Sequence, residues 1–320
     1  MMELTPEQLA IGTILMPYAM GKQQHVRSSK QRFVHYTSAD VAMSILTKGL
    51  VWMRNAVSMN DFSEMQHGKA CLIQAYSGEP GARFKVALDH LHEGFSADLA
   101  GRFNSWMPHF ERGTYMTCLS EHDDMEDDLG RLSMWRAYGK RNGIGLVMNC
   151  DPFVSQSDVL KAYTSPVSYL TPNEFSEEFM AICENLEKST DLLKLMSYEA
   201  LMGTIFNMFR FAMLCTKHPG FHEEREWRIV YNPTFDSSEH IVKSMEVVNG
   251  VPQMVYKIPM KSIPDEGLVG ADPKELLDRV IIGPTQDSLV LYEAFVTALA
   301  DLGIEDPISK VVVSGIPLRT

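Results

Sequence analysis

The amino-acid sequence predicts an α+β protein with a mixed, largely antiparallel sheet of short strands and with helical insertions. Two observations lead to this fold class. The segments rich in β-branched and aromatic residues are short, and they mostly follow one another without the regular alternation of strand and helix that a doubly wound sheet requires. Two long stretches have helical patterning instead, 61–110 and 172–217. The expected strands are residues 31–36, 50–53, 114–119, 143–148, 224–231, 241–248, 253–258 and 280–284.

The apolar stretch 9–20 near the N-terminus is expected to form a helix, with Pro6 in its first turn. It is too short to span a bilayer. We therefore divide the chain into an N-terminal helical extension, 1–30, and a single α+β domain, 31–320. That domain carries helical insertions near 61–110 and 172–217.

A compact strand–helix–strand unit opens the domain. The strand 31–36 leads into a helix over 41–48, and Gly49 follows as the left-handed residue that commonly ends a helix. The strand 50–53 comes next. A second short helix is expected over 131–138, directly after an acidic loop.

The composition is acidic, because 41 Asp and Glu stand against 29 Lys and Arg and give a formal net charge of −12. Such a surface repels a phosphate backbone, which disfavours non-specific binding to nucleic acid. The five cysteines are scattered and form no CxxC pair, so neither disulfides nor a thiolate zinc site is expected. With no signal-peptide pattern at residues 1–30, we expect a cytoplasmic protein without a membrane anchor.

His35 is the first candidate for a functional side chain. In the strand 31–36, alternation puts Phe33 and His35 on one face, and Val34 and Tyr36 on the other. His35 would lie just before a helix N-terminus, where backbone N–H groups can receive an anion. A structural histidine is the alternative interpretation.

Three further segments carry candidate groups. Ser120 ends the strand 114–119, and Trp135 and Tyr138 share a helix face as core residues or as a stacking platform. Asn60-Asp61, with Glu64 three residues later, is typical of a capped helix start, although Glu64 could also support a ligand cleft. The acidic loop 121–128 lacks the pattern of a calcium site and is expected to be a solvated surface loop.

The run Glu224-Arg225-Glu226-Trp227-Arg228 is the most informative segment. As a strand it places Glu224, Glu226 and Arg228 on one face, and Arg225 and Trp227 on the other. One interpretation is a solvated face with surface ion pairs of small energetic value. The other is a carboxylate fixed on a rigid strand to polarise a substrate hydroxyl, and both remain open.

Taken together and in this order, these segments resemble a family of uncharacterised bacterial proteins, DUF2971. The resemblance departs from the family pattern at Phe62, where proline is usual, and at Leu119, where phenylalanine is usual. The matching pieces are His35-Tyr36-Thr37, Met59-Asn60-Asp61 with Glu64, Cys118-Leu119-Ser120-Glu121, Met134-Trp135 with Tyr138, Gly143-Ile144-Gly145, Glu224-Arg225-Glu226-Trp227-Arg228 and Ile281-Ile282-Gly283-Pro284.

The unit His35-Tyr36-Thr37, helix, Gly49-Leu50 also resembles the opening of ADP-ribosyltransferase-like folds, such as the DarT-type DNA modifiers and RNA 2′-phosphotransferases. This resemblance implies an ADP-ribosyltransferase-like core with NAD as substrate. It implies that His35 anchors NAD, Ser120 shapes the nicotinamide pocket and Glu226 contacts the nicotinamide ribose, with Glu224 as its upstream partner. On the matched motifs it also implies that Tyr36, Thr37, Trp135 and Tyr138 bind NAD, and that Asn60, Asp61, Glu64 and Arg228 support the site.

Two classes of function follow as expectations. The first is an NAD-dependent ADP-ribosyltransferase or NAD glycohydrolase that needs no metal, acting as a bacterial toxin or phage-defence effector on an unknown protein or nucleic-acid acceptor. The second is a non-catalytic module that binds a nucleotide or a protein, in which the charged run around Glu226 is structural. A third class, a nuclease or other nucleic-acid hydrolase, is disfavoured by the acidic charge and by the lack of a metal cluster.

Overall fold

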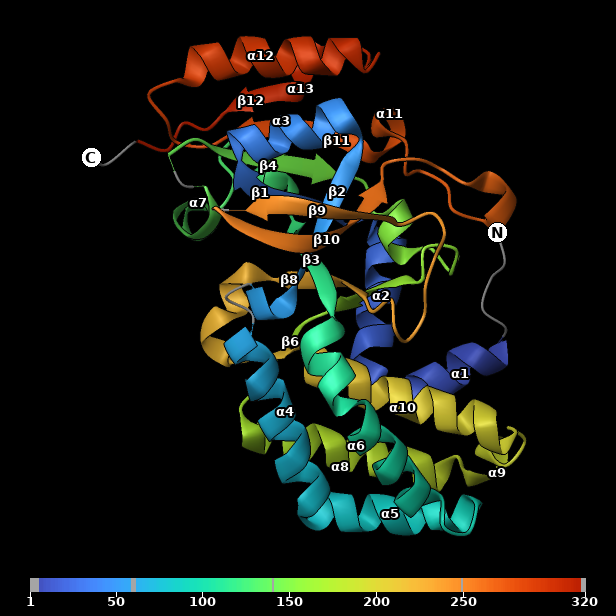
Figure 1. Cartoon of the computed structure of the whole chain (residues 1–320). Coiled ribbons are helices and arrows are strands. Elements are labelled where there is room, and N and C mark those ends of the chain that lie inside the picture. The colour runs from blue at the N-terminus through green and yellow to red at the C-terminus, as the bar shows by residue number, and fades with distance from the viewer. Residues whose placement is uncertain (1–5, 59–61, 140, 249, 318–320) are drawn as a thin grey trace.

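The computed structural model describes residues 6–58, 62–139, 141–248 and 250–317. Within them the strands form a ten-stranded sheet whose main path runs β12-β11-β4-β1-β3-β2-β10-β9, with β8 and β5 branching from β3 (Figure 1). Its pairs are antiparallel except β11 with β12. The strands are β1 (Arg32–Ser38), β2 (Leu50–Asn55), β3 (Tyr115–His122), β4 (Gly143–Met148), β5 (Ala162–Pro166), β8 (Glu226–Tyr231), β9 (Val242–Val248), β10 (Val251–Pro259), β11 (Leu277–Ile282) and β12 (Val311–Val313).

The prediction of a mixed, largely antiparallel α+β fold is confirmed. The expected strand 143–148 has the predicted bounds, and the other expected strands are present with shifted ends. Four short strands had no clear sequence signal. These are β5, β12 and the parallel pair β6 (Ser168–Tyr169) and β7 (Thr216–Lys217). The pairing of β6 with β7 places Lys217, which follows α10 (Tyr198–Leu214), beside β8. This pairing therefore adds a lysine to the candidate site.

The sheet splits where β1 leaves β3. These strands pair only from Arg32↔His122 to Val34↔Ser120, after which β3 pairs with β2 at Arg54↔Met116 and Asn55↔Tyr115. On its other edge β3 is paired with β8 along its length, from Tyr115 to Ser120. β3 is therefore the strand that joins the two branches of the sheet and the strand next to β8.

One face of the sheet packs under α3 (Ala39–Lys48) and α12 (Ser288–Asp301), which lie across the upper part of the molecule in Figure 1. The predicted helix end at Gly49 is confirmed, because Gly49 has φ 63° and its N–H bonds the Ile45 carbonyl. The sheet core includes Phe33 and Trp227, which meet edge to face with ring centroids 5.2 Å apart.

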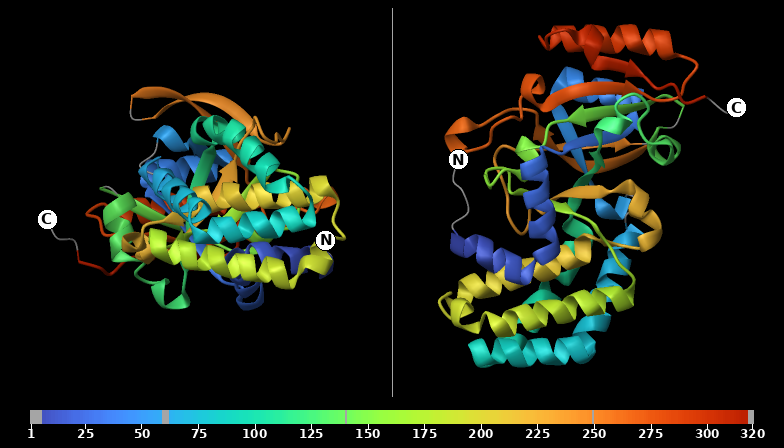
Figure 2. Two further views of the ribbon diagram at one scale, coloured as in Figure 1. Left: turned by 90° about the horizontal axis from the view of Figure 1, so that it is seen from below. Right: turned by 180° about the vertical axis from the view of Figure 1, so that it is seen from behind.

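A helical layer forms the lower half of the molecule in Figure 1 and in the right-hand view of Figure 2, and it has its own apolar core. The two predicted helical stretches build it, and the first is interrupted after Ser77 and after Leu91. Proline and glycine near these breaks remove backbone hydrogen bonds or favour non-helical angles. The helices are α4 (Phe62–Ser77), α5 (Glu79–Leu91), α6 (Phe95–Gly113), α8 (Pro172–Lys188), α9 (Thr190–Leu193) and α10 (Tyr198–Leu214).

The N-terminal residues form two helices, α1 (Pro6–Leu15) and α2 (Pro17–Ser29), where one was expected, because Pro17 begins a new helix. They connect the two layers. Leu15 is buried in the helical core, whereas Val26 is buried in the sheet core. The predicted extension 1–30 therefore packs as part of both cores in the region from Pro6 onward.

The short helix α7 (Leu132–Tyr138) covers the opposite face of the sheet from α3 and α12. Its Trp135 is 5% exposed and meets Tyr36 edge to face at 4.7 Å. Glycines of β4 and its surroundings make room for the indole: a Cβ at Gly143 or Gly283 would lie 3.0 or 2.8 Å from Trp135 ring atoms. The glycines of the motifs 143–145 and 281–284 thus allow Trp135 to pack closely on the sheet, which holds α7 and its residue Tyr138 in place.

Candidate functional site

Five charged side chains meet at the start of β8, on the face of the sheet that adjoins the helical layer. Lys217 Nζ lies 2.8 Å from Glu64 Oε1, 2.6 Å from Glu224 Oε2 and 3.0 Å from Glu226 Oε2. Arg228 Nε donates to Glu226 Oε1 at 2.7 Å, and its Nη2 donates to Glu64. We call Glu64, Lys217, Glu224, Glu226 and Arg228 the charged cluster.

Three members of the charged cluster are almost fully removed from water. Lys217 is 1% exposed, Arg228 0% and Glu226 5%. Arg228 also donates to the Leu214 carbonyl at the end of α10, at 2.6 Å. The interpretation of this strand face as solvated is therefore wrong, because the helices of the second insertion and β7 cover it.

The ionisation of Glu226 follows from its partners. Burial by itself raises the pKa of this carboxyl, but Arg228 and Lys217 outweigh it and lower the pKa to about 2. Burial likewise opposes the charge on Lys217, and Glu226 and Glu64 raise the pKa of Lys217 above its ordinary value. Both groups are therefore charged near neutral pH.

The charged cluster reaches the surface at Glu224. Tyr138, which is not a member of the cluster, lies at the same edge. The Glu224 side chain is 17% exposed, and burial raises its pKa more than Lys217 lowers it. Tyr138 at the end of α7 is 41% exposed, and burial followed by the charge of Glu224 raises the pKa of its phenol. These two side chains combine a partly solvated carboxyl with an accessible aromatic ring.

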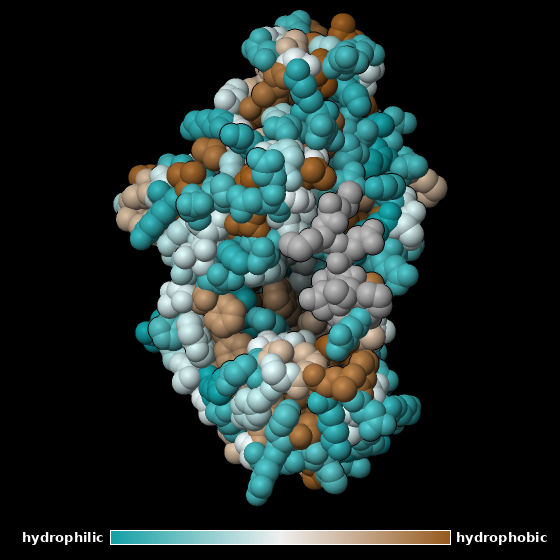
Figure 3. All heavy atoms as spheres, turned by 90° about the vertical axis from the view of Figure 1, so that its right-hand side faces the viewer, coloured by the Kyte–Doolittle hydropathy of each residue, from teal (hydrophilic) through white to brown (hydrophobic). Residues whose placement is uncertain are grey.

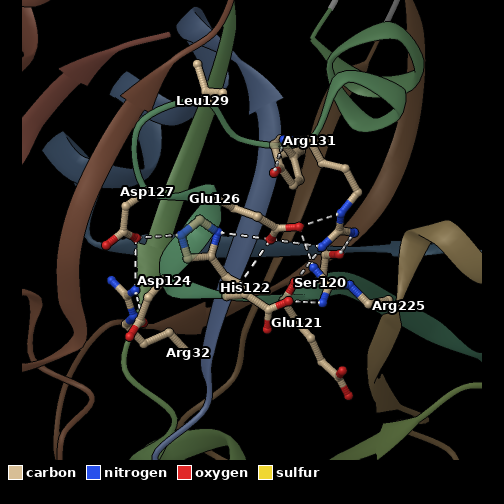
Figure 4. A network of polar contacts seen from close by, with 12 residues as sticks. Arg32, Ser120, Glu121, His122, Asp124, Glu126, Asp127, Leu129, Arg131 and Arg225 are labelled. Atoms are coloured by element: carbon tan, nitrogen blue, oxygen red, sulfur yellow. Dashed lines mark hydrogen bonds and ion pairs between the residues drawn. The ribbon is translucent and has the colours of Figure 1, made fainter.

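Ser120 lies on the same face as Glu226 because the two are directly paired in the β3–β8 ladder. Its hydroxyl is engaged: it donates to the Glu224 carbonyl and accepts from Arg131 Nη1 at 2.8 Å. Figure 4 shows Arg131 beside Ser120, between the acidic loop and β3. Ser120 is 1% exposed, so its contribution is to hold the backbone at Glu224.

His35 lies on the other face of the sheet. Val34 is paired with Ser120, and Ser120 with Glu226, so the next residue, His35, points away from both. Its ring lines a small apolar cavity of about 80 Å³ under α3, and its Nδ1 is 2.9 Å from the Cys118 carbonyl. Burial lowers the pKa of His35. The expectation that His35, Ser120 and Glu226 share one pocket is therefore corrected.

The remaining predicted residues divide between the two faces. Tyr36 is on the Trp135 face, where its hydroxyl accepts from the Arg131 backbone N–H at 3.0 Å, whereas Thr37 shares the alternate face with His35. Glu64 belongs to the charged cluster at the start of α4. Asn60 and Asp61 lie outside the described residues.

The acidic loop is not simply a solvated surface loop, as it was expected to be. Its carboxylates form ion pairs with arginines that are distant in sequence, shown in part in Figure 4. Asp127 lies 2.9 Å from Arg32 Nη2 and 3.0 Å from Arg279 Nη2, and Glu126 lies 2.5 Å from Arg225 Nη2. This arrangement orders the loop that leads into α7.

Sequence reasoning predicted Arg228 but missed Lys217 and Arg131, two further cations on this face. A buried lysine has no local signature, because only the β6–β7 pairing brings Lys217 beside β8. Among the described residues no group of three or more His, Cys, Asp or Glu is placed to hold a metal ion. In the same part of the chain, no helix is both long and apolar enough to cross a membrane.

Comparison with known proteins identifies one segment. Residues 134–229 match the family model of DUF2971, a protein of unknown function. The predicted resemblance to DUF2971 is confirmed over these residues. The DUF2971 segment runs from α7 to β8, so it contains Trp135, Tyr138 and four members of the charged cluster, but neither His35 nor Glu64. No curated protein and no solved structure matches the chain.

Proposed function

We propose that this protein consumes NAD, by ADP-ribosyl transfer or by hydrolysis, with the nicotinamide ribose bound where Glu224 and Tyr138 reach the surface. The observation that supports this proposal is the charge of the cluster. Three carboxylates (Glu64, Glu224 and Glu226) face two cations (Lys217 and Arg228), which leaves a formal charge of −1 beside an accessible aromatic ring.

The chemistry explains why an excess of negative charge is useful here. Breaking the bond between nicotinamide and ribose builds positive charge on the ribose, and a carboxylate held nearby stabilises that charge. Preorganisation makes the effect larger, because a fixed group needs no rearrangement during the reaction. The ion pairs of Glu226 on a central strand provide such rigidity.

The proposal assigns different roles to the two glutamates. Both oxygens of Glu226 are within ion-pair distance of Arg228 or Lys217, so Glu226 is a positioning residue. Glu224, which is partly exposed and whose pKa is raised, is the carboxylate that meets the ribose. Tyr138 offers its ring face to the nicotinamide, and His35 is assigned no contact with NAD.

The test measures the release of nicotinamide from NAD by chromatography. The reactions contain either water as the sole acceptor or an added protein or nucleic acid. Glu224→Gln should reduce the rate by about 100-fold or more while the variant remains folded by circular dichroism. Glu223→Gln is the matched control, because Glu223 is the exposed neighbour of Glu224 and lies outside the cluster. Equal rates for wild type and Glu224→Gln would contradict the proposal.

A second candidate is a non-catalytic module that binds a nucleotide or a protein. The saturation of both Glu226 oxygens by cations favours it, since a buried ion-paired carboxylate also fits a structural role. This candidate predicts that no acceptor supports nicotinamide release. It also predicts that Glu224→Gln alters only ligand or partner affinity, which calorimetry would detect.

A further inference from the structure

A large cavity lies between the two layers, and neither Glu224 nor Tyr138 lines it. Its volume is about 800 Å³, within the range of roughly 300–1,000 Å³ that small-molecule sites occupy. Helices α1, α2, α8 and α10 contribute to its wall, as do β5 and the segment around Phe235. Figure 3 faces this side of the molecule and shows a hollow at mid-height with apolar residues on its walls.

The wall of the cavity is mainly aromatic and aliphatic. Nine of its lining residues are Phe or Tyr, among them Tyr18 from α2, Phe179 from α8 and Phe211 from α10. Aromatic rings offer large rigid contact areas to an apolar ligand. A cavity with this lining is suited to a ligand whose binding free energy comes mainly from removing apolar surface from water.

The tyrosine hydroxyls that line the cavity already have partners. The Tyr18 hydroxyl donates to the Val167 carbonyl at 3.0 Å, and the Tyr163 hydroxyl donates to Asp236 at 3.1 Å. The Tyr169 hydroxyl accepts from the Glu226 backbone N–H at 2.7 Å. A ligand therefore does not need to supply many hydrogen bonds.

The charges around the cavity disfavour an anion. Glu178 and Asp236 are among its described lining residues, whereas none of those residues is Lys, Arg or His. Lys161 lies 3.9 Å from Asp236 and does not line the cavity. Arg210 is 1% exposed and stands behind the Phe235 and Phe211 rings, at 4.8 and 5.3 Å from their centroids. An anionic group inside would be buried without a facing cation, which is costly.

We propose that this cavity is a binding site for an uncharged, largely apolar aromatic small molecule. It is separate from the NAD site proposed above, because a dinucleotide carries two phosphates that find no cation among the cavity's described lining residues. The proposal does not depend on any catalytic activity.

Two fluorescent probes with the same ring system test the proposal on the full-length protein. N-phenyl-1-naphthylamine is neutral, and 8-anilinonaphthalene-1-sulfonate adds one negative charge. The neutral probe should bind at one site per chain and at least tenfold more tightly than the sulfonate. Absence of saturable binding by the neutral probe, or tighter binding of the sulfonate, would overturn the proposal.

Two substitutions locate the probe. Ala19→Trp places an indole at the wall from α2 and should weaken the neutral probe at least tenfold, whereas Gln24→Trp, on the exposed side of the same helix, should not. Glu178→Lys changes an exposed lining residue without breaking an ion pair of the described structure, and should strengthen sulfonate binding several-fold. Unchanged affinities in Ala19→Trp and Glu178→Lys would show that the probe binds elsewhere and would overturn the assignment.

Discussion

Replacing Lys217 by methionine tests how much the charged cluster contributes to the free energy of unfolding. Lys217 is 1% exposed and contacts Glu64, Glu224 and Glu226 at 2.6 to 3.0 Å. Methionine keeps much of the volume and removes the charge, so three carboxylates would share the single cation of Arg228. Breaking a buried ion pair by removing one partner costs about 3–5 kcal/mol, and we expect Lys217→Met to lose that much free energy of unfolding near pH 7.

The loss should depend on pH in a definite direction. In the wild type the folded-state pKa of Glu226 is about 2, below its ordinary value of 4.5. Its ion pairs therefore stabilise the fold above about pH 4.5, and this contribution disappears as the pH falls toward 2. In Lys217→Met the carboxylates are easier to protonate, so the difference between variant and wild type should shrink on acidification.

Urea unfolding followed by circular dichroism, near pH 7 and near pH 4, measures this effect. Lys161→Met is the control, because Lys161 pairs with the exposed Asp158 and should lose about 1 kcal/mol or less. A loss below about 1 kcal/mol for Lys217→Met near pH 7, or a loss that grows on acidification, would refute the description of the cluster as buried and ion-paired.

Four further predictions follow from the packing and the site. Gly283→Ala should lower the free energy of unfolding by about 1–3 kcal/mol, because the new Cβ would lie 2.8 Å from the Trp135 ring; an unchanged urea midpoint would exclude the tight contact. Trp227→Ala should cost about 3–5 kcal/mol in the same assay, since this side chain is 1% exposed in the sheet core, and a loss below about 1 kcal/mol would contradict that burial. His35→Ala should lower stability yet retain nicotinamide release, and a complete loss of release in a folded variant would place His35 at the reaction. The rate of release should fall on acidification with a midpoint above pH 4.5, because the pKa of Glu224 is raised and its ionised form is required; a pH-independent rate would remove Glu224 from the chemistry.

Much of the fold follows from local patterns in the sequence. Alternation in the strand 31–36 correctly separated His35 from Tyr36, and Gly49 correctly marked the end of α3. The run at β8 was also predicted to carry Glu226 and Arg228 on one face and Trp227 on the other, where Trp227 is buried in the sheet core. These features depend on backbone geometry over a few neighbouring residues, so they can be predicted from local patterns in the sequence.

The candidate site was less predictable because it depends on register between distant strands. Alternation assigns faces within one strand, but only the pairing of Val34 with Ser120 and of Ser120 with Glu226 shows that His35 is on the opposite face. The burial of Glu226 depends on Lys217, which reaches it through the β6–β7 pair. Contacts of this kind have no local signature in one sequence.

The most direct test of the proposed NAD site is a crystal structure of the protein with carba-NAD, an analogue whose nicotinamide bond is not cleaved. We expect the nicotinamide ribose to lie against Glu224 and the nicotinamide ring to lie over Tyr138, on the face of β8 that carries Glu226. The proposed NAD site would be contradicted if carba-NAD were bound beside His35 on the opposite face or in the large apolar cavity. It would also be contradicted if the crystal contained no carba-NAD at a saturating concentration.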